Sequence, residues 1–160
     1  MISPFLKRLL FARQFFMIDG KIEILGKKQV MLPSDVVSCL QNNDPKEVYT
    51  NIKSTISKDI EDYAKKLGSS GEGMLRNIED IFGTFGLGKL EVVDLDYKSK
   101  KGVIRIHNPP LDDIKKINSG FQVTPAVLAG VFSFLFSKEI NAQQAKQSIK
   151  GTGYHEYILK

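Results

Sequence analysis

Residues 123–136 read Val-Thr-Pro-Ala-Val-Leu-Ala-Gly-Val-Phe-Ser-Phe-Leu-Phe, the most apolar stretch of this chain. A membrane-spanning helix needs about 17 residues or more, whereas this stretch has fourteen and is followed by Ser137 and Lys138. The composition predicts a buried helix over Pro125–Phe136 that is apolar on nearly every side and lies between two layers of structure. One face of this helix has only small residues, where a neighbouring backbone or a ligand can come close: Ala126, Ala129, Gly130 and Ser133.

Two predicted hairpins flank this core helix in the sequence. Before it, the alternation over Leu87–Tyr97 predicts a strand buried partly on both faces, with Val103–His107 as its hairpin partner. After it, Ala142–Ile149 and Tyr154–Leu159 are predicted as two strands joined by the turn Lys150–Gly153. We therefore expect an antiparallel sheet packed against the helix.

The first 32 residues predict a short helix followed by a small antiparallel meander. Helical spacing of apolar residues covers Pro4–Gln14. The strands Phe15–Ile18 and Lys21–Leu25 flank Asp19-Gly20, a dipeptide typical of tight hairpins, and Gln29–Leu32 is the predicted third strand.

The next 50 or so residues are predicted to be helical. One helix begins at Pro33 and runs through Leu40, a long one begins at Asp44-Pro45 and runs to Leu67, and a third covers Met74 to about Gly83. Residues 111–118 form a polar connection with room for a short helix. The fold class is thus α+β in a single domain, divided into an amino-terminal helix and meander (1–32), a helical part (33–83), and a sheet with the core helix (84–160).

Composition narrows the class of protein. The length of 160 residues and the 42% of hydrophobic residues fit one globular domain. The formal net charge is +5, but basic residues are interleaved with acidic ones, which favours a solvated surface over a nucleic-acid-binding face. The single cysteine excludes an internal disulfide, and basic residues interrupt the apolar start of the chain, so it does not resemble an export signal. We expect a cytoplasmic protein with no membrane span and no nucleic-acid partner.

No group of residues indicates catalysis or a bound cofactor. The glycine-rich run Gly83–Gly88 follows a predicted helix and enters a strand, the reverse of the order that binds phosphate. Cys39 lies on a predicted amphipathic helix, where we expect an inert buried thiol. His107 ends a strand, and a solvated histidine is favoured there over a site residue. A non-catalytic role is therefore favoured over an enzyme.

Several short motifs taken together resemble the 4-vinyl reductase domain family. These are small ligand-binding domains whose fold is similar to that of Golgi transport-particle subunits and haem nitric-oxide sensors. The motifs are Phe85–Asp94, Val103–Pro110, Ala129–Ser133, Lys138–Ile140, Lys150–Gly151 and Tyr154–Tyr157, while Phe16–Gly26 resembles the opening of archaeal-type members.

The resemblance also implies where a metal would bind. Members that sense aromatic compounds carry a structural zinc site, formed by a cysteine before the core helix and a Glu-x-x-Cys-x7-Cys run. In this chain those positions are occupied by Phe121, Gln144, Gln147 and His155. Phenylalanine has no lone pair and neutral amides are weak zinc ligands, so we predict no metal.

The family name implies reduction of a vinyl group, but the chain has neither a dinucleotide fingerprint nor an evident pair of proton donors. A binding or sensing domain for a small hydrophobic or aromatic molecule fits better. An apolar helix beside a sheet is suited to enclose a pocket for such a ligand. The candidate lining residues are Leu128, Phe132 and Phe136 on the core helix, facing Ile104 and Ile106 on the strand.

We expect the domain to act as a homodimer. The amino-terminal helix exposes Phe5, Leu9 and Phe11 unless the chain itself covers them, and ligand occupancy would alter this contact or a contact with another partner. Two alternatives stay open: a reductase acting on a vinyl group of a tetrapyrrole-like ring, and a protein-interaction or assembly subunit with a filled core.

Overall fold

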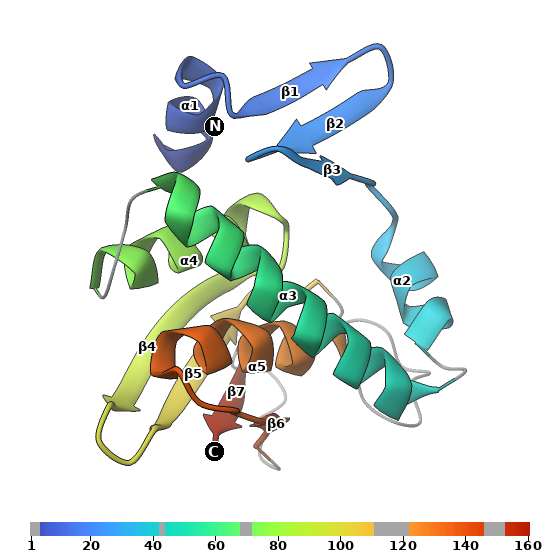
Figure 1. The fold of residues 1–160 in the computed structure, drawn as a ribbon. Coiled ribbons are helices and arrows are strands. Elements are labelled where there is room, and N and C mark those ends of the chain that lie inside the picture. The colour runs from blue at the N-terminus through green and yellow to red at the C-terminus, as the bar shows by residue number, and fades with distance from the viewer. Residues whose placement is uncertain (1–3, 42–43, 68–71, 111–121, 146–152) are drawn as a thin grey trace.

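A computed structural model of the chain describes residues 4–41, 44–67, 72–110, 122–145 and 153–160 (Figure 1). These residues form helices α1 to α5, a three-stranded sheet and a four-stranded sheet, both antiparallel. The predicted α+β class is therefore confirmed. In the described ranges, no helix combines the length and the apolarity needed to cross a membrane.

The predicted core helix is α5 (Val123–Phe136), and it lies between the four-stranded sheet and α3 (Pro45–Leu67). The sheet has the strand order β4-β5-β7-β6, with bounds β4 Lys89–Asp96, β5 Lys101–His107, β6 Ala142–Gln144 and β7 Tyr154–Leu159. In the register of the sheet, Ile104 pairs with Val92 on one side and with Tyr157 on the other. Alternate residues of β5 are buried because they face the helix.

Helix α3 crosses α5 at close range at Gly130. A Cβ atom at residue 130 would lie 2.6 Å from the backbone oxygen of Lys53 and 2.9 Å from the Cβ atom of Ile56. The small-residue face of α5 therefore receives a neighbouring backbone at this position. The amino end of α3 is capped by Asp44, whose Oδ1 accepts hydrogen bonds from the amides of Lys46 (3.1 Å) and Glu47 (2.9 Å).

Helix α1 (Pro4–Phe11) contacts α4 (Glu72–Thr84), which in turn contacts β4. Phe5 and Leu9 are buried, so the chain itself covers two of the three residues expected at a dimer contact, while Phe11 is 89% exposed. The helix ends at Phe11 instead of Gln14 because Arg13 has a left-handed backbone (φ 53°).

The meander consists of β1 (Phe15–Ile18), β2 (Lys21–Ile24) and β3 (Lys27–Gln29). The predicted third strand, Gln29–Leu32, was placed two residues too late. A left-handed turn at Leu25 and Gly26 (φ 53° and 78°) returns the chain at once, so residues 27–29 pair with 22–24.

Helix α2 (Ser34–Gln41) turns a different side toward the rest of the protein than its sequence predicts. Leu40 is 59% exposed and Cys39 is exposed too, so the expectation of a buried thiol is wrong. Ser38 and Gln41 are buried instead, and Oε1 of Gln41 accepts a hydrogen bond from the backbone amide of Gln122 (2.8 Å). This contact at the start of α5 explains why the polar face of α2 turns inward.

Some predicted features fall on parts of the chain that the structure leaves out. The strand predicted over Ala142–Ile149 is observed over Ala142–Gln144, and residues 146–152 lie outside the described residues. The polar connection 111–118 also lies outside them.

Candidate functional site

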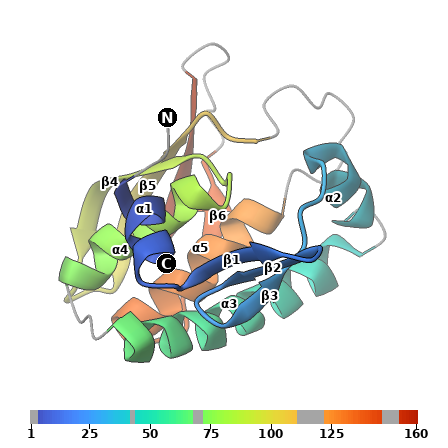
Figure 2. The ribbon, with the colours of Figure 1, turned by 90° about the horizontal axis from the view of Figure 1, so that it is seen from above.

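A cavity of about 290 Å³ lies between α3, α4, α5 and the segment that follows β3. Figure 2 shows the meander passing over α3 and α5, which places β3 as the cover of this space. The apolar walls come from four segments: Ile56 and Ile60 on α3; Ile78, Ile81 and Phe82 on α4 with Phe85 and Leu87 after it; Val127 and Val131 on α5; and Val30 after β3.

Polar groups meet at one end of the cavity. Asp59 and Tyr63 are four residues apart on α3 and so lie on the same face of the helix. The side chain of Gln29 also lines the cavity, hydrogen-bonds with the Tyr63 hydroxyl, and donates from Nε2 to the backbone oxygen of Lys27 (3.3 Å). This end therefore offers a carboxylate, a hydroxyl and an amide to a bound molecule.

Lys27 connects the meander to α3 across this polar end. Its Nζ atom lies 2.9 Å from Oδ1 of Asp59 and 2.9 Å from Oδ2 of Asp62. The two carboxylates, Asp62 first, hold the pKa of Lys27 above its usual range. Burial, with a smaller effect from Asp59, raises the pKa of Tyr63 above its ordinary value of 10.0, so its hydroxyl is neutral at physiological pH and both donates and accepts hydrogen bonds.

The five residues predicted to line a pocket lie together, as expected, but none of them lines this cavity. Leu128, Phe132 and Phe136 follow one another at four-residue steps on α5 and belong to the same core cluster as Ile104 and Ile106. All five are at most 2% exposed. At 3.6 residues per turn this row is turned by roughly 120° from Val127 and Val131. Contact between these five residues and a ligand stays a prediction.

Sequence reasoning did not find the polar end of the cavity. Ile56, Ile60 and Tyr63 belong to the apolar periodicity that predicted α3, and Asp59 lies within the same stripe. A carboxylate within an apolar stripe is a usable signal, since it marks a charge that faces other elements instead of bulk water. Lys27, by contrast, is brought to Asp59 only by the turn before β3.

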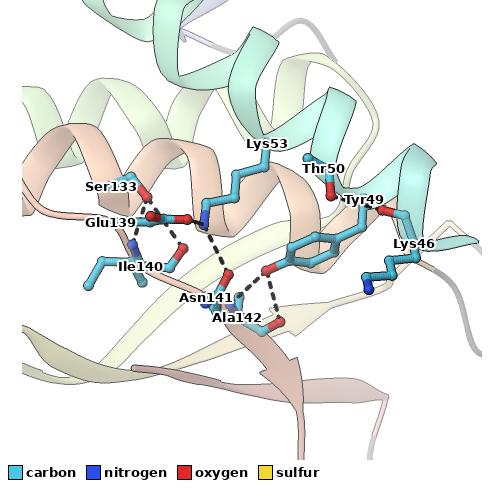
Figure 3. A network of polar contacts seen from close by, with 9 residues as sticks. All are labelled: Lys46, Tyr49, Thr50, Lys53, Ser133, Glu139, Ile140, Asn141 and Ala142. Atoms are coloured by element: carbon cyan, nitrogen blue, oxygen red, sulfur yellow. Dashed lines mark hydrogen bonds and ion pairs between the residues drawn. The ribbon is translucent and has the colours of Figure 1, made fainter.

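A second polar cluster joins α3 to the segment between α5 and β6 (Figure 3). The hydroxyl of Tyr49 accepts from the amide of Ala142 (3.0 Å) and donates to its carbonyl (3.4 Å). Nζ of Lys53 donates to Glu139 (3.0 Å) and to Asn141 (2.9 Å). Two open grooves flank the cluster, but its polar groups bind one another, so we interpret it as a joint of the fold.

Two of the four candidate zinc positions lie in the described residues, on the neighbouring strands β6 and β7. Gln144 is exposed on β6 and His155 is half-buried on β7, while Phe121 and Gln147 lie outside the described residues. No group of three or more His, Cys, Asp or Glu side chains with metal-binding spacing occurs in the part of the chain that the structure describes.

His107 is a partnered residue at the end of β5. Its Nε2 atom hydrogen-bonds to Glu91 on β4, and its ring lies 5.5 Å from that of Tyr154, centroid to centroid. The bond to His107 lowers the pKa of Glu91 below its ordinary value. His107 is absent from the linings of the described cavities, and its hydrogen bond to Glu91 accounts for its position.

The chain is similar to known proteins in fold. No protein-family model matches it, and no curated protein matches it in sequence. Among solved structures, the phenol-responsive sensory domain of the transcription activator PoxR, determined with phenol, aligns with a TM-score of 0.71 at 15% identity, covering 99% of this chain and 91% of that one.

Two further structures align less well. A vinyl-4-reductase family protein from Methanocaldococcus jannaschii has a TM-score of 0.47 at 18% identity, covering 84% of this chain and 83% of that one. A trafficking protein particle complex subunit 3 from Naegleria fowleri, covalently bound to palmitic acid, has a TM-score of 0.47 at 16% identity, covering 79% and 88%. The fold that the sequence predicts is confirmed by the alignment with the phenol-responsive sensory domain.

Proposed function

We propose that this chain is a non-catalytic domain that binds and senses a small apolar or aromatic molecule in the cavity between α3, α4, α5 and β3. The observation that carries the proposal is the cavity itself: about 290 Å³, with apolar walls and with polar groups gathered at one end. The shared fold with a phenol-responsive sensory domain supports a sensing role. A filled core, as expected for an assembly subunit, is less consistent with a space of this size.

The apolar walls alone supply a modest affinity. An aromatic ligand that buries about 150–250 Å² gains about 4–6 kcal/mol at about 25 cal/mol per Å². Without further contacts this corresponds to a Kd on the order of 0.05–1 mM. A hydrogen bond involving a charged group adds about 1.5–3 kcal/mol, so the polar end decides whether binding reaches the micromolar range.

Filling the cavity tests the proposal. Val131→Phe places a larger side chain into the space between α3 and α5, and Val103→Phe on β5, which is outside the cavity lining, is the matched control. We expect organic extraction and mass spectrometry to recover an apolar compound from the purified wild type and from the control. Calorimetry should detect binding of an added bicyclic aromatic alcohol to both proteins. Val131→Phe should lose both signals. The proposal is wrong if Val131→Phe folds and binds as the wild type does, or if no apolar compound binds the wild type.

We further propose that two copies associate through the meander and the end of α1. Phe11, Met17, Ile18, Val30 and Met31 are 59–89% exposed, and exposed apolar side chains that form a patch are typical of an interaction surface. A second copy is the occupant that we favour, because a two-fold contact places the same apolar patch on both sides. Sedimentation equilibrium at micromolar concentration should give a dimer.

Met31→Asp should give a monomer in the same experiment. The control Val93→Asp introduces the same charge at an exposed apolar residue on β4 and should remain a dimer. A monomeric wild type would exclude the association and leave the ligand-binding proposal untouched.

A further inference from the structure

We infer that residues 27–30 form a movable cover over the cavity, and that the contacts of Lys27 with Asp59 and Asp62 on α3 hold it closed and so set the rates at which a ligand enters and leaves. The inference rests on the proposed function and goes beyond it, because it assigns how access to the cavity is controlled. Three features carry it: a wall one residue thick, a turn about which that wall can move, and a fastening contact that lies outside the cavity lining.

The cover is a wall one residue thick. Val30 lines the cavity and is also 80% exposed to solvent, so no second layer of described residues lies behind it. On the helical walls, Ile78, Phe82 and Val131 are at most 1% exposed, because other parts of the chain pack behind them. A ligand that enters through the cover therefore passes no packed layer of side chains.

Another part of the wall, Phe85 and Leu87, is also only half-buried, but the backbone holds it in place. The amide of Phe85 donates to the carbonyl of Ile81 (2.9 Å), and the amide of Leu87 donates to that of Phe82 (3.0 Å). Opening the cavity on this side would break these bonds at the end of α4. The cover is fastened to α3 by side chains instead, so it is the part that opens more readily.

The turn before β3 supplies the pivot. Leu25 is 2% exposed, and its amide donates to the backbone oxygen of Gln14 (2.7 Å), so the chain is fixed there. Gly26 follows with φ 78°, in a region of backbone conformation that glycine reaches without steric cost. β3 then lies at the edge of its sheet and pairs with β2 alone, over three residues. The segment after Gly26 can therefore move while Leu25 stays in place.

Lys27 fastens the cover to α3. Its Nζ atom lies 2.9 Å from a carboxylate oxygen of Asp59 and 2.9 Å from one of Asp62, and the three side chains are 27–37% exposed. Ion pairs of this exposure are weak, and salt screens them, so they break and re-form without unfolding of the domain. Asp62 also interacts with Lys65, three residues further along α3, so it keeps a cation nearby when Lys27 moves away.

The position of Lys27 gives this contact a kinetic signature. Lys27 is not among the residues that line the cavity, so its ion pairs stabilise the closed cover to the same extent with and without a ligand inside. Their removal raises the open fraction in both states, and association and dissociation accelerate by the same factor. Kd, the ratio of the two rate constants, stays unchanged. Loss of a contact with the ligand would instead speed dissociation alone and weaken binding.

Stopped-flow fluorescence with 1-naphthylmethanol measures both rates for the full chain. Its two fused rings suit a space of about 290 Å³, since a dry cavity of about 150 Å³ in another protein holds one benzene ring. The probe is uncharged, and the chain has no tryptophan to overlap with the naphthyl emission. We expect Lys27→Gln to raise both rates about fivefold, which is what two weak ion pairs supply, and to leave Kd unchanged within about twofold.

Lys28→Gln is the matched control. It removes the same charge from the next residue of β3, whose side chain is exposed and points away from that of Lys27, so both rates should stay as in the wild type. A second measurement uses salt. Between about 20 mM and about 500 mM, both rates of the wild type and of Lys28→Gln should rise about threefold as the ion pairs are screened, while those of Lys27→Gln should not respond.

Two precautions keep the test decisive. If Lys27→Gln does not fold, the salt dependence of the wild type and of Lys28→Gln decides. Repeating the measurements in Met31→Asp removes any contribution from association of two copies.

The outcomes separate this inference from the proposed function. Binding of 1-naphthylmethanol with rates that neither Lys27→Gln nor salt changes overturns the role of the cover, while binding in the cavity stands. A weaker Kd with an unchanged association rate in Lys27→Gln overturns it as well, because Lys27 would then act on the bound ligand. Equal acceleration in Lys28→Gln overturns it too, since the effect would follow from net charge. If 1-naphthylmethanol does not bind at all, the inference and the proposed function are both overturned.

Discussion

Replacement of Gly130 by alanine sets two effects of opposite sign against each other. Alanine is the better helix former by about 0.8–1.0 kcal/mol, so propensity alone predicts a more stable α5. The structure opposes this, because the new Cβ would lie 2.6 Å from the backbone oxygen of Lys53, where ordinary contact begins at 3.4 Å. That oxygen belongs to the backbone of α3, so this clash is removed only if the whole helix moves.

The magnitude follows from these two terms. Overpacking of a close contact costs about 1–3 kcal/mol, and after the gain in helix propensity we expect Gly130→Ala to lower the free energy of unfolding by about 1 kcal/mol. The matched control is Gly83→Ala in α4, where a Cβ meets nothing within 4 Å. Its propensity gain is unopposed, so it should raise the free energy of unfolding by about 0.5–1 kcal/mol.

Urea denaturation followed by far-ultraviolet circular dichroism measures both changes. If the free energy of unfolding depends on urea concentration with the same slope in both proteins, the shift in the midpoint of unfolding multiplied by that slope gives the difference in free energy. The reasoning is refuted if Gly130→Ala is stabilised as much as Gly83→Ala, because α3 would then not lie against residue 130. A second readout is ligand affinity, which should fall in Gly130→Ala because the displaced helix carries Ile56, a residue of the cavity wall.

Three further predictions follow from contacts away from the cavity. Phe132→Ala should lower the free energy of unfolding by about 3–5 kcal/mol in the same assay, since the ring is fully buried. Tyr49→Phe should cost about 1–2 kcal/mol, because the backbone groups of Ala142 lose their hydrogen-bond partner. In wild type, carbon-detected NMR should place the pKa of Glu91 below the ordinary 4.5, and in His107→Ala the pKa should rise, because the largest of the interactions that lower it is lost. This contact therefore stabilises the fold above about pH 4.5 and is lost as the pH falls through the lowered pKa, and an unchanged titration in the variant would contradict it.

The elements with strong periodicity are those that the sequence predicts well. α3 is observed over Pro45–Leu67 as expected, because its apolar residues repeat at helical spacing and Asp44 supplies the cap. α5 is observed over Val123–Phe136, two residues longer at its start than predicted. In both cases local information suffices, since a long amphipathic or apolar helix has few alternative structures.

The local sequence of a helix does not determine which of its sides faces the core. The pattern of α2 predicts a helix, but which side faces inward depends on the hydrogen bond between Gln41 and Gln122, which are 81 positions apart in the sequence. The polar end of the cavity also depends on residues that are far apart in the sequence. Asp59 and Lys27 meet because the turn at Leu25 and Gly26 is left-handed, and a prediction that placed the third strand later than it lies could not bring them together.

The position of the cavity follows from how the layers pack. On the sheet side of α5, Ile104 and Ile106 are 0% exposed and belong to one buried cluster with the large residues Leu128, Phe132 and Phe136 of the helix. On the other side, α3 crosses α5 obliquely and touches it closely at Gly130 (Figure 1). Two helices that cross at an angle diverge away from their contact point, so the space beside Val127 and Val131 has to be closed by other elements.

Here α4 and β3 close that space only in part. α4 contributes large side chains to it, but the residues of α5 that face it are valines, and β3 covers it with Gln29 and Val30. The cover is fastened to α3 by Lys27, on a meander of three short strands. A small three-stranded sheet has little stability of its own, so a ligand that fills the space beneath it would stabilise the meander.

The apolar surface proposed for the dimer lies on the same meander. Binding in the cavity and association of two copies would therefore be coupled through one element, and the dimer should dissociate less readily when the ligand is bound. Sedimentation with and without a bicyclic aromatic alcohol measures this coupling, and an association constant that the ligand leaves unchanged would show that the meander does not transmit occupancy.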